Sequence, residues 1–187
     1  FSFYPGKNLG AYGDGGAIVT NNYKLFKTSK MIANHGRLNK FDNKFEGRNS
    51  RLDTIQSSIL IVKLKYLNDL VKKRNKNAEI YKKYLEKNNN IVLPINSSKI
   101  KHSYHLFVIR VNNREKLIKE FKRNNIQYGI HYPKALFKLK AYKYIKQNTK
   151  NFVSGDIDKK IISLPVHEYL KEKEIKKVCR VINSTII

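Results

Sequence analysis

Lys7 is the residue of this sequence with the clearest chemical potential. It follows a short apolar and aromatic stretch that is typical of a strand end, and it comes after a Pro-Gly turn in the glycine-rich segment FSFYPGKNLGAYGDGG. An amine in this place is held at the end of a strand and directed into the adjacent crevice. Where desolvation or a cationic neighbour removes its proton, such an amine attacks a carbonyl carbon and forms a Schiff base. Most loop lysines face solvent, so the spacing alone leaves both interpretations open.

Two better-known phosphate-binding motifs do not fit this loop. A P-loop has Ser or Thr after its lysine, whereas Asn8 follows Lys7. The dinucleotide fingerprint leads from a strand into a helix, whereas Gly13–Gly16 leads into the apolar segment Ala17–Thr20, which we predict to be a short buried strand. A reactive lysine is therefore the specific chemistry that remains.

Four blocks of the sequence resemble, in the same order, motifs of the DegT/StrS family of sugar aminotransferases. The blocks are the lysine segment Ser2–Gly10 with Gly13–Ala17, the run Gly47–Gln56, the run Ser103–Val108 and the run Gly129–Pro133. The second block is similar to the family pattern G-x-N-x-R-L-D-x-x-Q. The blocks run in the family's order from Ser2 to Pro133, so the resemblance implies an α/β protein of the pyridoxal-phosphate-dependent fold type I.

The resemblance also implies a domain organisation. Residues 1–52 would be the end of the large cofactor-binding domain, 53–87 a long interdomain helix and 88–187 the small C-terminal α/β domain. The family's N-terminal half supplies an Asp for the pyridine nitrogen, an aromatic residue that stacks on the ring and a helix N-terminus for the phosphate. Since the sequence opens with Phe1 inside an apolar stretch, we expect it to be a fragment and expect residues 1–187 by themselves to be inactive.

Three residues are expected to bind the cofactor, pyridoxal 5'-phosphate. By the resemblance, Lys7 would bind it as a Schiff base and move a proton between the substrate carbon and the cofactor. Ser2 would donate its hydroxyl to the cofactor phosphate, and Asn49 would reach across a dimer interface to the phosphate in the neighbouring subunit. The resemblance therefore implies a homodimer with shared active sites.

Three further residues are expected to bind substrate. Arg51 would lie near the carboxylate of the amino donor, His105 would contact the donor or the sugar, and Tyr132 would line the sugar-nucleotide channel. A surface arginine at a helix start and a structural histidine on a strand are the alternatives for Arg51 and His105. The expected substrates are glutamate and a nucleotide-linked keto deoxysugar, aminated at C3 or C4, for polysaccharide or glycan synthesis. The segment after Pro133 departs from the family pattern, so it does not define the sugar.

The elements that must position these residues follow from periodicity. Ser50–Asp53 fits a capping box, and apolar residues then recur at spacings of three and four, which predicts a long amphipathic helix reaching about Lys87. We also predict a helix over 23–34. After the helix break at residues 88–90, we predict strands over 104–111, 126–131 and 161–164, and helices over 114–124, 134–146 and 171–185.

The composition is that of an ordinary globular protein, with 41% hydrophobic and 28% charged residues. The longest aliphatic run, Ile59–Val62, is far shorter than the roughly 20 apolar residues of a membrane-spanning helix. Cys179 is the one cysteine and cannot form an internal disulfide, as expected of a protein in the reducing cytoplasm. His35, His102 and His167 lack the spacing of metal ligands, so we expect no metal. Because the aliphatic runs are too short to span a membrane, we also expect no membrane partner.

The net charge of +25 allows a competing interpretation. The excess is mostly Lys, is spread along the chain and accompanies many Asn and Ile, so we attribute it to a skewed base composition and expect no nucleic-acid partner. The alternatives are a non-catalytic regulator with this fold and a basic domain that binds polyanions. Binding that falls steeply with salt would indicate the polyanion-binding domain.

Overall fold

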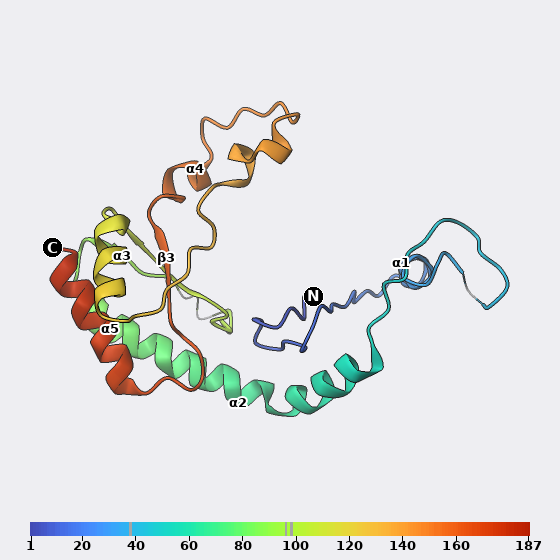
Figure 1. Cartoon of the computed structure of the whole chain (residues 1–187), viewed down its shortest axis with the longest axis horizontal. Coiled ribbons are helices and arrows are strands. Elements are labelled where there is room, and N and C mark those ends of the chain that lie inside the picture. Colours follow the sequence, from blue (N-terminus) through green and yellow to red (C-terminus); the bar gives the residue numbers. More distant parts are fainter. Residues whose placement is uncertain (38, 96, 98) are drawn as a thin grey trace. The chain divides into compact units, whose positions relative to one another are not determined.

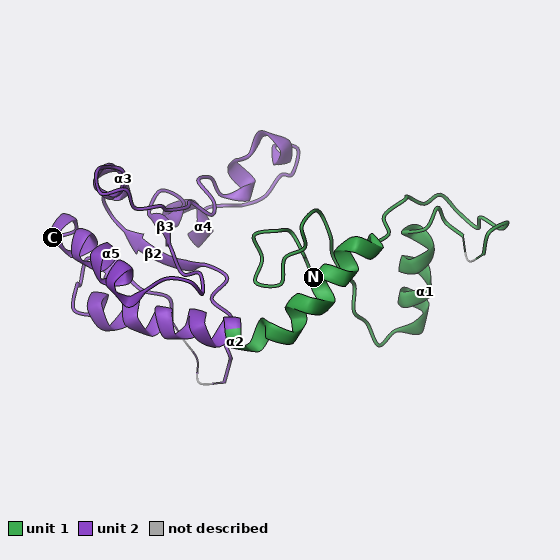
Figure 2. Ribbon diagram, turned by 60° about the horizontal axis from the view of Figure 1, so that its bottom comes forward, with its two compact units in different colours: residues 1–69 green, residues 70–187 purple. Residues whose placement is uncertain are grey.

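The computed structural model describes residues 1–37, 39–95, 97 and 99–187. The helices are α1 (Tyr23–Ile32), α2 (Thr54–Leu85), α3 (Arg114–Arg123), α4 (Val153–Ile157) and α5 (Glu172–Thr185), with two short 3₁₀ helices, η1 (Leu136–Lys138) and η2 (Lys140–Tyr142), and the strands are β1 (Ile91–Val92), β2 (Phe107–Val111) and β3 (Ile161–Leu164) (Figure 1). The chain forms two compact units, residues 1–69 and 70–187, called unit 1 and unit 2 below (Figure 2). The predicted division into residues 1–52, 53–87 and 88–187 stays a prediction.

Unit 1 consists of loops, α1 and the first half of α2. Helix α1 begins after Asn22, whose side-chain oxygen accepts a hydrogen bond from the Leu25 amide at 3.0 Å and so caps the helix. The strand predicted over Ala17–Thr20 is wrong. A β-bridge joins Ser2 to Gly16, but Ile18 and Val19 are 72% and 75% exposed and lie outside any strand. β-Branched residues favour strands only where a neighbouring strand pairs with them.

Helix α2 confirms the long helix that the periodicity predicts, but it begins later than the capping box implied. The amide of Ser50 donates to the Ala33 carbonyl at 2.9 Å, and Asn49 forms a β-bridge with Asn34, so this stretch remains extended. The first helical hydrogen bond joins the Ser57 amide to the Asp53 carbonyl at 2.9 Å. Ser50 is therefore part of a loop and not the cap of α2. None of the described helices is long and apolar enough to cross a membrane.

Unit 2 is built on an antiparallel three-stranded sheet with the order β1-β2-β3. Burial alternates along β2: Phe107, Ile109 and Val111 are buried, and the residues between them are half-buried. One face of the sheet therefore packs into the core. The helical part of the core comes from the C-terminal half of α2, from α3 and from α5, and α5 lies alongside α2 (Figure 1). This arrangement confirms the predicted α/β class.

Helix α5 contributes the one cysteine of the sequence to this core. Cys179 is 2% exposed, and burial raises the pKa of its thiol to about 12. The fold does not use this thiol in a disulfide. It packs as a small apolar side chain.

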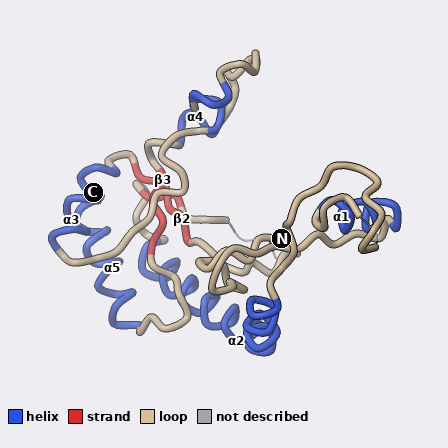
Figure 3. The backbone as a smooth tube through the Cα atoms, turned by 45° about the vertical axis from the view of Figure 1, so that its right-hand side comes forward, coloured by secondary structure: helices blue, strands red, loops and turns tan. Residues whose placement is uncertain are grey.

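The stretch between α3 and β3 differs most from the predicted elements (Figure 3). The predicted strand over 126–131 is reduced to one bridge between Gly129 and Ser163, and the predicted helix over 134–146 is replaced by η1 and η2. Leu139 between them has extended backbone angles. Tertiary contacts override the helical propensity of this stretch, because the Ala135 amide and the Lys138 ammonium both donate to the Asp158 carboxylate.

Asp158 yields a prediction about stability. Its carboxylate is buried and accepts hydrogen bonds from Lys138 at 2.8 Å and from the Ala135 amide at 3.2 Å. The Lys138 ammonium holds the pKa of Asp158 below its usual range. The ionised carboxylate therefore stabilises the fold above the unfolded pKa of about 3.9, and this contribution is lost as the pH falls through the folded-state pKa.

We expect Asp158→Asn to lower the free energy of unfolding at pH 7 by about 2 kcal/mol, because two donors lose a charged acceptor. The difference from the wild type should shrink toward pH 3. Urea unfolding at both pH values measures it. Glu172→Gln is the control, since Glu172 pairs with Lys176 on an exposed helix surface and such pairs contribute little. Equal urea midpoints for Asp158→Asn and the wild type at pH 7 would contradict the prediction.

Candidate active site

Lys7 lies in a loop that backbone hydrogen bonds close tightly. The Phe3 amide donates to the Gly15 carbonyl at 2.8 Å, and the Ala11 amide donates to the Phe3 carbonyl at 2.8 Å. Within this closure, the Lys7 amide donates to the Tyr4 carbonyl at 2.9 Å and forms the predicted Pro-Gly turn. The Lys7 side chain is half-buried. The lysine thus lies on a rigid turn between two paired segments.

Helix α2 anchors the far side of this loop. Lys63 Nζ donates to the Gly10 carbonyl at 2.5 Å, and the Tyr12 amide donates to Gln56 Oε1 at 2.8 Å. Gly10 itself packs so closely that a Cβ atom there would overlap the carbonyl of Pro5. Only glycine therefore permits this approach of the two backbone segments. These anchors fix the loop that carries Lys7 to the first turns of α2.

Ser2 lies on the same loop, five residues before Lys7, and is paired with Gly16. Its hydroxyl oxygen accepts a hydrogen bond from the Tyr4 amide at 3.3 Å. Because the oxygen acts as an acceptor in that contact, the hydroxyl hydrogen can be donated elsewhere. A phosphate oxygen is an acceptor that suits this donor.

Asn49 and Arg51 lie on the loop that runs from α1 to α2. Arg51 Nε donates to Asn49 Oδ1 at 3.1 Å. This contact makes Oδ1 the acceptor and leaves Nδ2 as the atom through which Asn49 can donate to a phosphate. Both side chains are exposed.

Two glycines close this loop. Gly36 has a φ of +76°, and a Cβ on it would overlap the Phe45 carbonyl. A Cβ on Gly47 would overlap the Gly36 amide nitrogen. The Arg48 amide then donates to the Ile32 carbonyl at 2.7 Å, which returns the chain to α1 just before Asn49. The position of Asn49 thus depends on a backbone contact that admits no side chain.

The donor set of unit 1 fits a cofactor that has an aldehyde and a phosphate. Lys7 offers a primary amine for the aldehyde, and Ser2 Oγ and Asn49 Nδ2 are hydrogen-bond donors for the phosphate. Lys7 and Ser2 share one loop, and Asn49 and Arg51 share a hydrogen bond in the same unit.

His105 and Tyr132 belong to unit 2. His105 follows Tyr104, which is fully buried and has a φ of +41°. Tyr132 is 72% exposed, and its ring packs edge-on against His131 with centroids 5.6 Å apart. His131 in turn contacts the Ser163 hydroxyl through Nδ1 at 2.8 Å.

The structure adds residues that we did not single out in the sequence. Lys63 and Gln56 hold the lysine loop, and Arg74 contacts the backbone before His105. Gln56 lies inside the second sequence block, which is the one signal that could have identified it. Lys63 and Arg74 carry no such signal, because their partners are distant in the sequence.

Known proteins match this chain over almost its whole length. A family model described as the DegT/DnrJ/EryC1/StrS aminotransferase family matches residues 1–183. The chain is 42% identical over 199 residues to the dTDP-3-amino-3,6-dideoxy-alpha-D-galactopyranose transaminase of Aneurinibacillus thermoaerophilus, covering 97% of this chain and 54% of the relative. It is 36% identical over 174 residues to the erythromycin biosynthesis sensory transduction protein EryC1 of Saccharopolyspora erythraea, covering 92% and 48%.

A solved structure is also similar. The crystal structure of S. venezuelae DesV in complex with a ketimine intermediate matches with a TM-score of 0.92 and 30% identity, covering 98% of this chain and 50% of DesV. The chain spans about half the length of the curated relatives it matches.

Proposed function

Because the chain belongs to the DegT/DnrJ/EryC1/StrS aminotransferase family, we propose that the full-length protein transfers an amino group from an amino acid, with glutamate as the donor, to a keto group of a nucleotide-linked deoxysugar. The observation that carries this proposal is the Lys7 loop, with a primary amine on a turn that α2 anchors. The transaminase named above supports a dTDP-linked keto deoxyhexose as the acceptor. The product would enter polysaccharide or glycan synthesis in the cytoplasm.

The proposal concerns the full-length protein, because residues 1–187 match only about half the length of the relatives. We propose that residues 1–52 end the large domain, that 53–87 form the interdomain helix and that 88–187 form the small domain. By themselves, residues 1–187 would be inactive.

Pyridoxal 5'-phosphate is the cofactor that the family requires, and the donor set of unit 1 fits it. When bound, it acts as an electron sink for the carbon atom that loses a proton. Lys7 Nζ would hold its aldehyde carbon, and Ser2 Oγ would donate a hydrogen bond to its phosphate. Asn49 Nδ2 would donate to the phosphate of the cofactor in the neighbouring subunit. Lys7 Nζ would also accept the proton from the substrate carbon and return it, as a general base and then a general acid.

The remaining site residues would bind substrate. Arg51 would provide a positive charge for the donor's carboxylate, and its contact with Asn49 would hold both side chains in place. His105 would contact the donor or the sugar, and the exposed Tyr132 would line the nucleotide channel.

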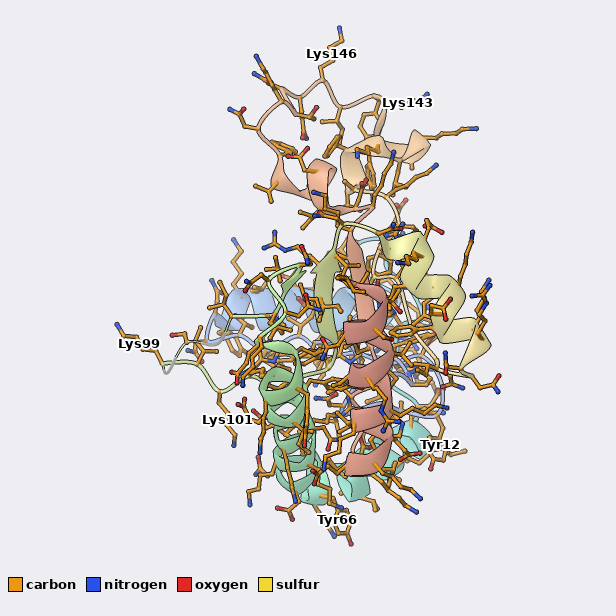
Figure 4. All side chains as sticks on the ribbon, turned by 90° about the vertical axis from the view of Figure 1, so that its left-hand side faces the viewer. Tyr12, Tyr66, Lys99, Lys101, Lys143 and Lys146 are labelled. Carbon is orange, nitrogen blue, oxygen red and sulfur yellow. The ribbon has the colours of Figure 1, made fainter. Side chains whose placement is uncertain are left out.

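A homodimer with shared sites is part of this proposal. Large apolar side chains of the first half of α2 are exposed; they are Ile55, Ile61, Val62, Leu64 and Tyr66. Tyr66 projects away from the helix (Figure 4). Exposed apolar side chains along this half of the helix favour burial in the full-length dimer. Asn49 of one subunit would then reach the cofactor phosphate of the other.

Incubation of the full-length protein with pyridoxal phosphate, glutamate and a panel of nucleotide keto sugars tests the function. We expect 2-oxoglutarate and an amino sugar in equal amounts with a dTDP-linked acceptor. Without the acceptor, the reaction should stop after the first half-reaction, because the amino group taken from glutamate is then not transferred to a sugar. Bound cofactor without turnover on any acceptor would contradict the proposal.

The second candidate function is regulation without catalysis. It is favoured by the relative that is named as a sensory transduction protein, and it predicts cofactor binding without amino transfer. The polyanion-binding alternative has less support. The lysines labelled in Figure 4 lie on two separate segments, with Lys99 and Lys101 on one and Lys143 and Lys146 on the other. This dispersal of the lysines favours an ordinary solvated surface over a polyanion-binding surface.

A further inference from the structure

Arg74, in the C-terminal half of α2, connects two loops of unit 2. Its side chain is 11% exposed. Nη1 donates to the Tyr104 carbonyl at 3.2 Å and approaches the His105 carbonyl at 3.5 Å, while Nη2 pairs with Glu168 Oε2 at 2.9 Å. A planar guanidinium has several N–H donors, so it can donate hydrogen bonds to the backbone carbonyls and to the Glu168 carboxylate at the same time. Arg74 therefore holds the backbone of residues 104–105 against the loop after β3.

Two neighbouring contacts hold the same turn. Asn75 Nδ2 donates to the His102 carbonyl at 2.8 Å, and the Tyr104 amide donates to His102 Nδ1 at 2.9 Å. The Tyr104 ring is fully buried, 5.8 Å from the Phe107 ring. Its φ of +41° is a conformation that a bulky residue keeps only where its surroundings determine it. The turn at 102–105 is thus fixed by α2 and by the core together.

We propose that Arg74 is a positioning residue for amino transfer. It fixes the backbone at Tyr104 and His105 and thereby orients the His105 imidazole toward the substrate. This inference rests on the proposed function, in which His105 contacts the donor or the sugar. Because the Tyr104 backbone directs the residue that follows it, a small change in the Arg74 contacts rotates the His105 side chain.

Arg114 provides a matched control. It is also buried, lies in the same unit and donates through Nη1 to two backbone carbonyls, those of Asp158 at 2.7 Å and Ile161 at 3.3 Å. These partners belong to the segment around the start of β3 and not to residues 102–105. A purely structural role predicts similar consequences for substitution of Arg74 and Arg114.

The test is a double-mutant cycle in the full-length protein. Arg74→Lys keeps a positive charge beside Glu168. A single ammonium group cannot, however, donate to Glu168 and to the Tyr104 carbonyl in the geometry of the guanidinium. We expect Arg74→Lys to lower kcat/KM for amino transfer about tenfold in the wild-type background and less than about twofold in the His105→Ala background, because both changes act on one group. Arg114→Lys should lower the melting temperature and leave kcat/KM within about twofold in both backgrounds.

A second measurement does not depend on turnover. In protein labelled with ¹³C-histidine, the His105 imidazole signal is assigned by its loss in His105→Ala. We expect Arg74→Lys to shift this signal and Arg114→Lys to leave it in place. If Arg74→Lys does not fold, Asn75→Ala carries both measurements, because it removes the hydrogen bond to the same turn.

Equal losses of kcat/KM in both backgrounds would overturn the proposal, as would an unmoved His105 signal. Failure of the proposed function looks different. In that case the wild-type protein produces no amino sugar, while the His105 signal still reports whether Arg74 orients the imidazole.

Discussion

Lys7→Ala should lower kcat for amino transfer by the full-length protein at least about 10³-fold, because it removes both the group that holds the cofactor and the base that moves the proton. The amine lies on a turn closed by hydrogen bonds of Tyr4 and Phe3, which fix its place in the loop. Borohydride reduction followed by peptide mass analysis should find the cofactor attached to the peptide that contains Lys7, and should find no attachment in the variant.

Lys63→Ala is the matched control for this labelling. Lys63 contributes a second primary amine to the same loop, but its Nζ donates to the Gly10 carbonyl. Its removal should loosen the loop and leave the attachment on Lys7. A cofactor adduct that persists in Lys7→Ala would assign the attachment to another residue and refute the proposed role.

Gly36→Ala is expected to lower the free energy of unfolding by about 3 kcal/mol, because alanine is strained in a left-handed backbone conformation and because its Cβ would overlap a neighbouring carbonyl. Gly36 has a φ of +76°, and a Cβ there would overlap the Phe45 carbonyl. Because the loop leads to Asn49, the affinity for pyridoxal phosphate should also fall about tenfold. Urea unfolding and a cofactor titration of the full-length protein measure the two effects.

Gly13→Ala serves as its comparison. The nearest atom to a Cβ at Gly13 is Gln56 Nε2, at 3.2 Å, so the Gln56 amide needs to shift by only a few tenths of an ångström, which leaves its hydrogen bond to the Tyr12 amide within reach. We expect a small change in stability and in cofactor affinity. If Gly36→Ala unfolds at the same urea concentration as Gly13→Ala, the close backbone contact at Gly36 does not stabilise the loop.

The elements that were predicted correctly are those whose signals are local. Helix α2 follows from apolar spacing over eight turns, and α3 and α5 follow from the same periodicity with polar residues at their starts. β3 was predicted at its observed bounds, 161–164, from the short apolar run that begins with Ile161 and Ile162, and in the structure β2 pairs with it.

The elements that were predicted wrongly depend on distant partners. Ala17–Thr20 has the composition of a strand, but its pairing stops at Ala17, which exchanges backbone hydrogen bonds with Phe1, and Ile18 and Val19 are exposed. The stretch 134–146 has the composition of a helix, yet its backbone and side chains bond to Asp158, which comes much later in the sequence. No local pattern contains such partners.

The candidate site shows the same division between local and distant signals. Lys7 was identified because a lysine after a Pro-Gly turn is a local pattern that also resembles a family motif. The contact of Arg51 with Asn49 and the contact of Arg74 with Tyr104 were not predicted, since the first depends on side-chain geometry and the second spans 30 residues. The roles of Lys7, Ser2, Asn49, Arg51, His105 and Tyr132 stay predictions.

Because Cys179 is buried, the reactivity of its thiol reports how often the core of unit 2 opens. A thiol that is 2% exposed and has a raised pKa reacts with disulfide reagents only when the core around α5 separates. The rate of its modification would therefore record how often unit 2 opens under native conditions, without denaturant and without an engineered label.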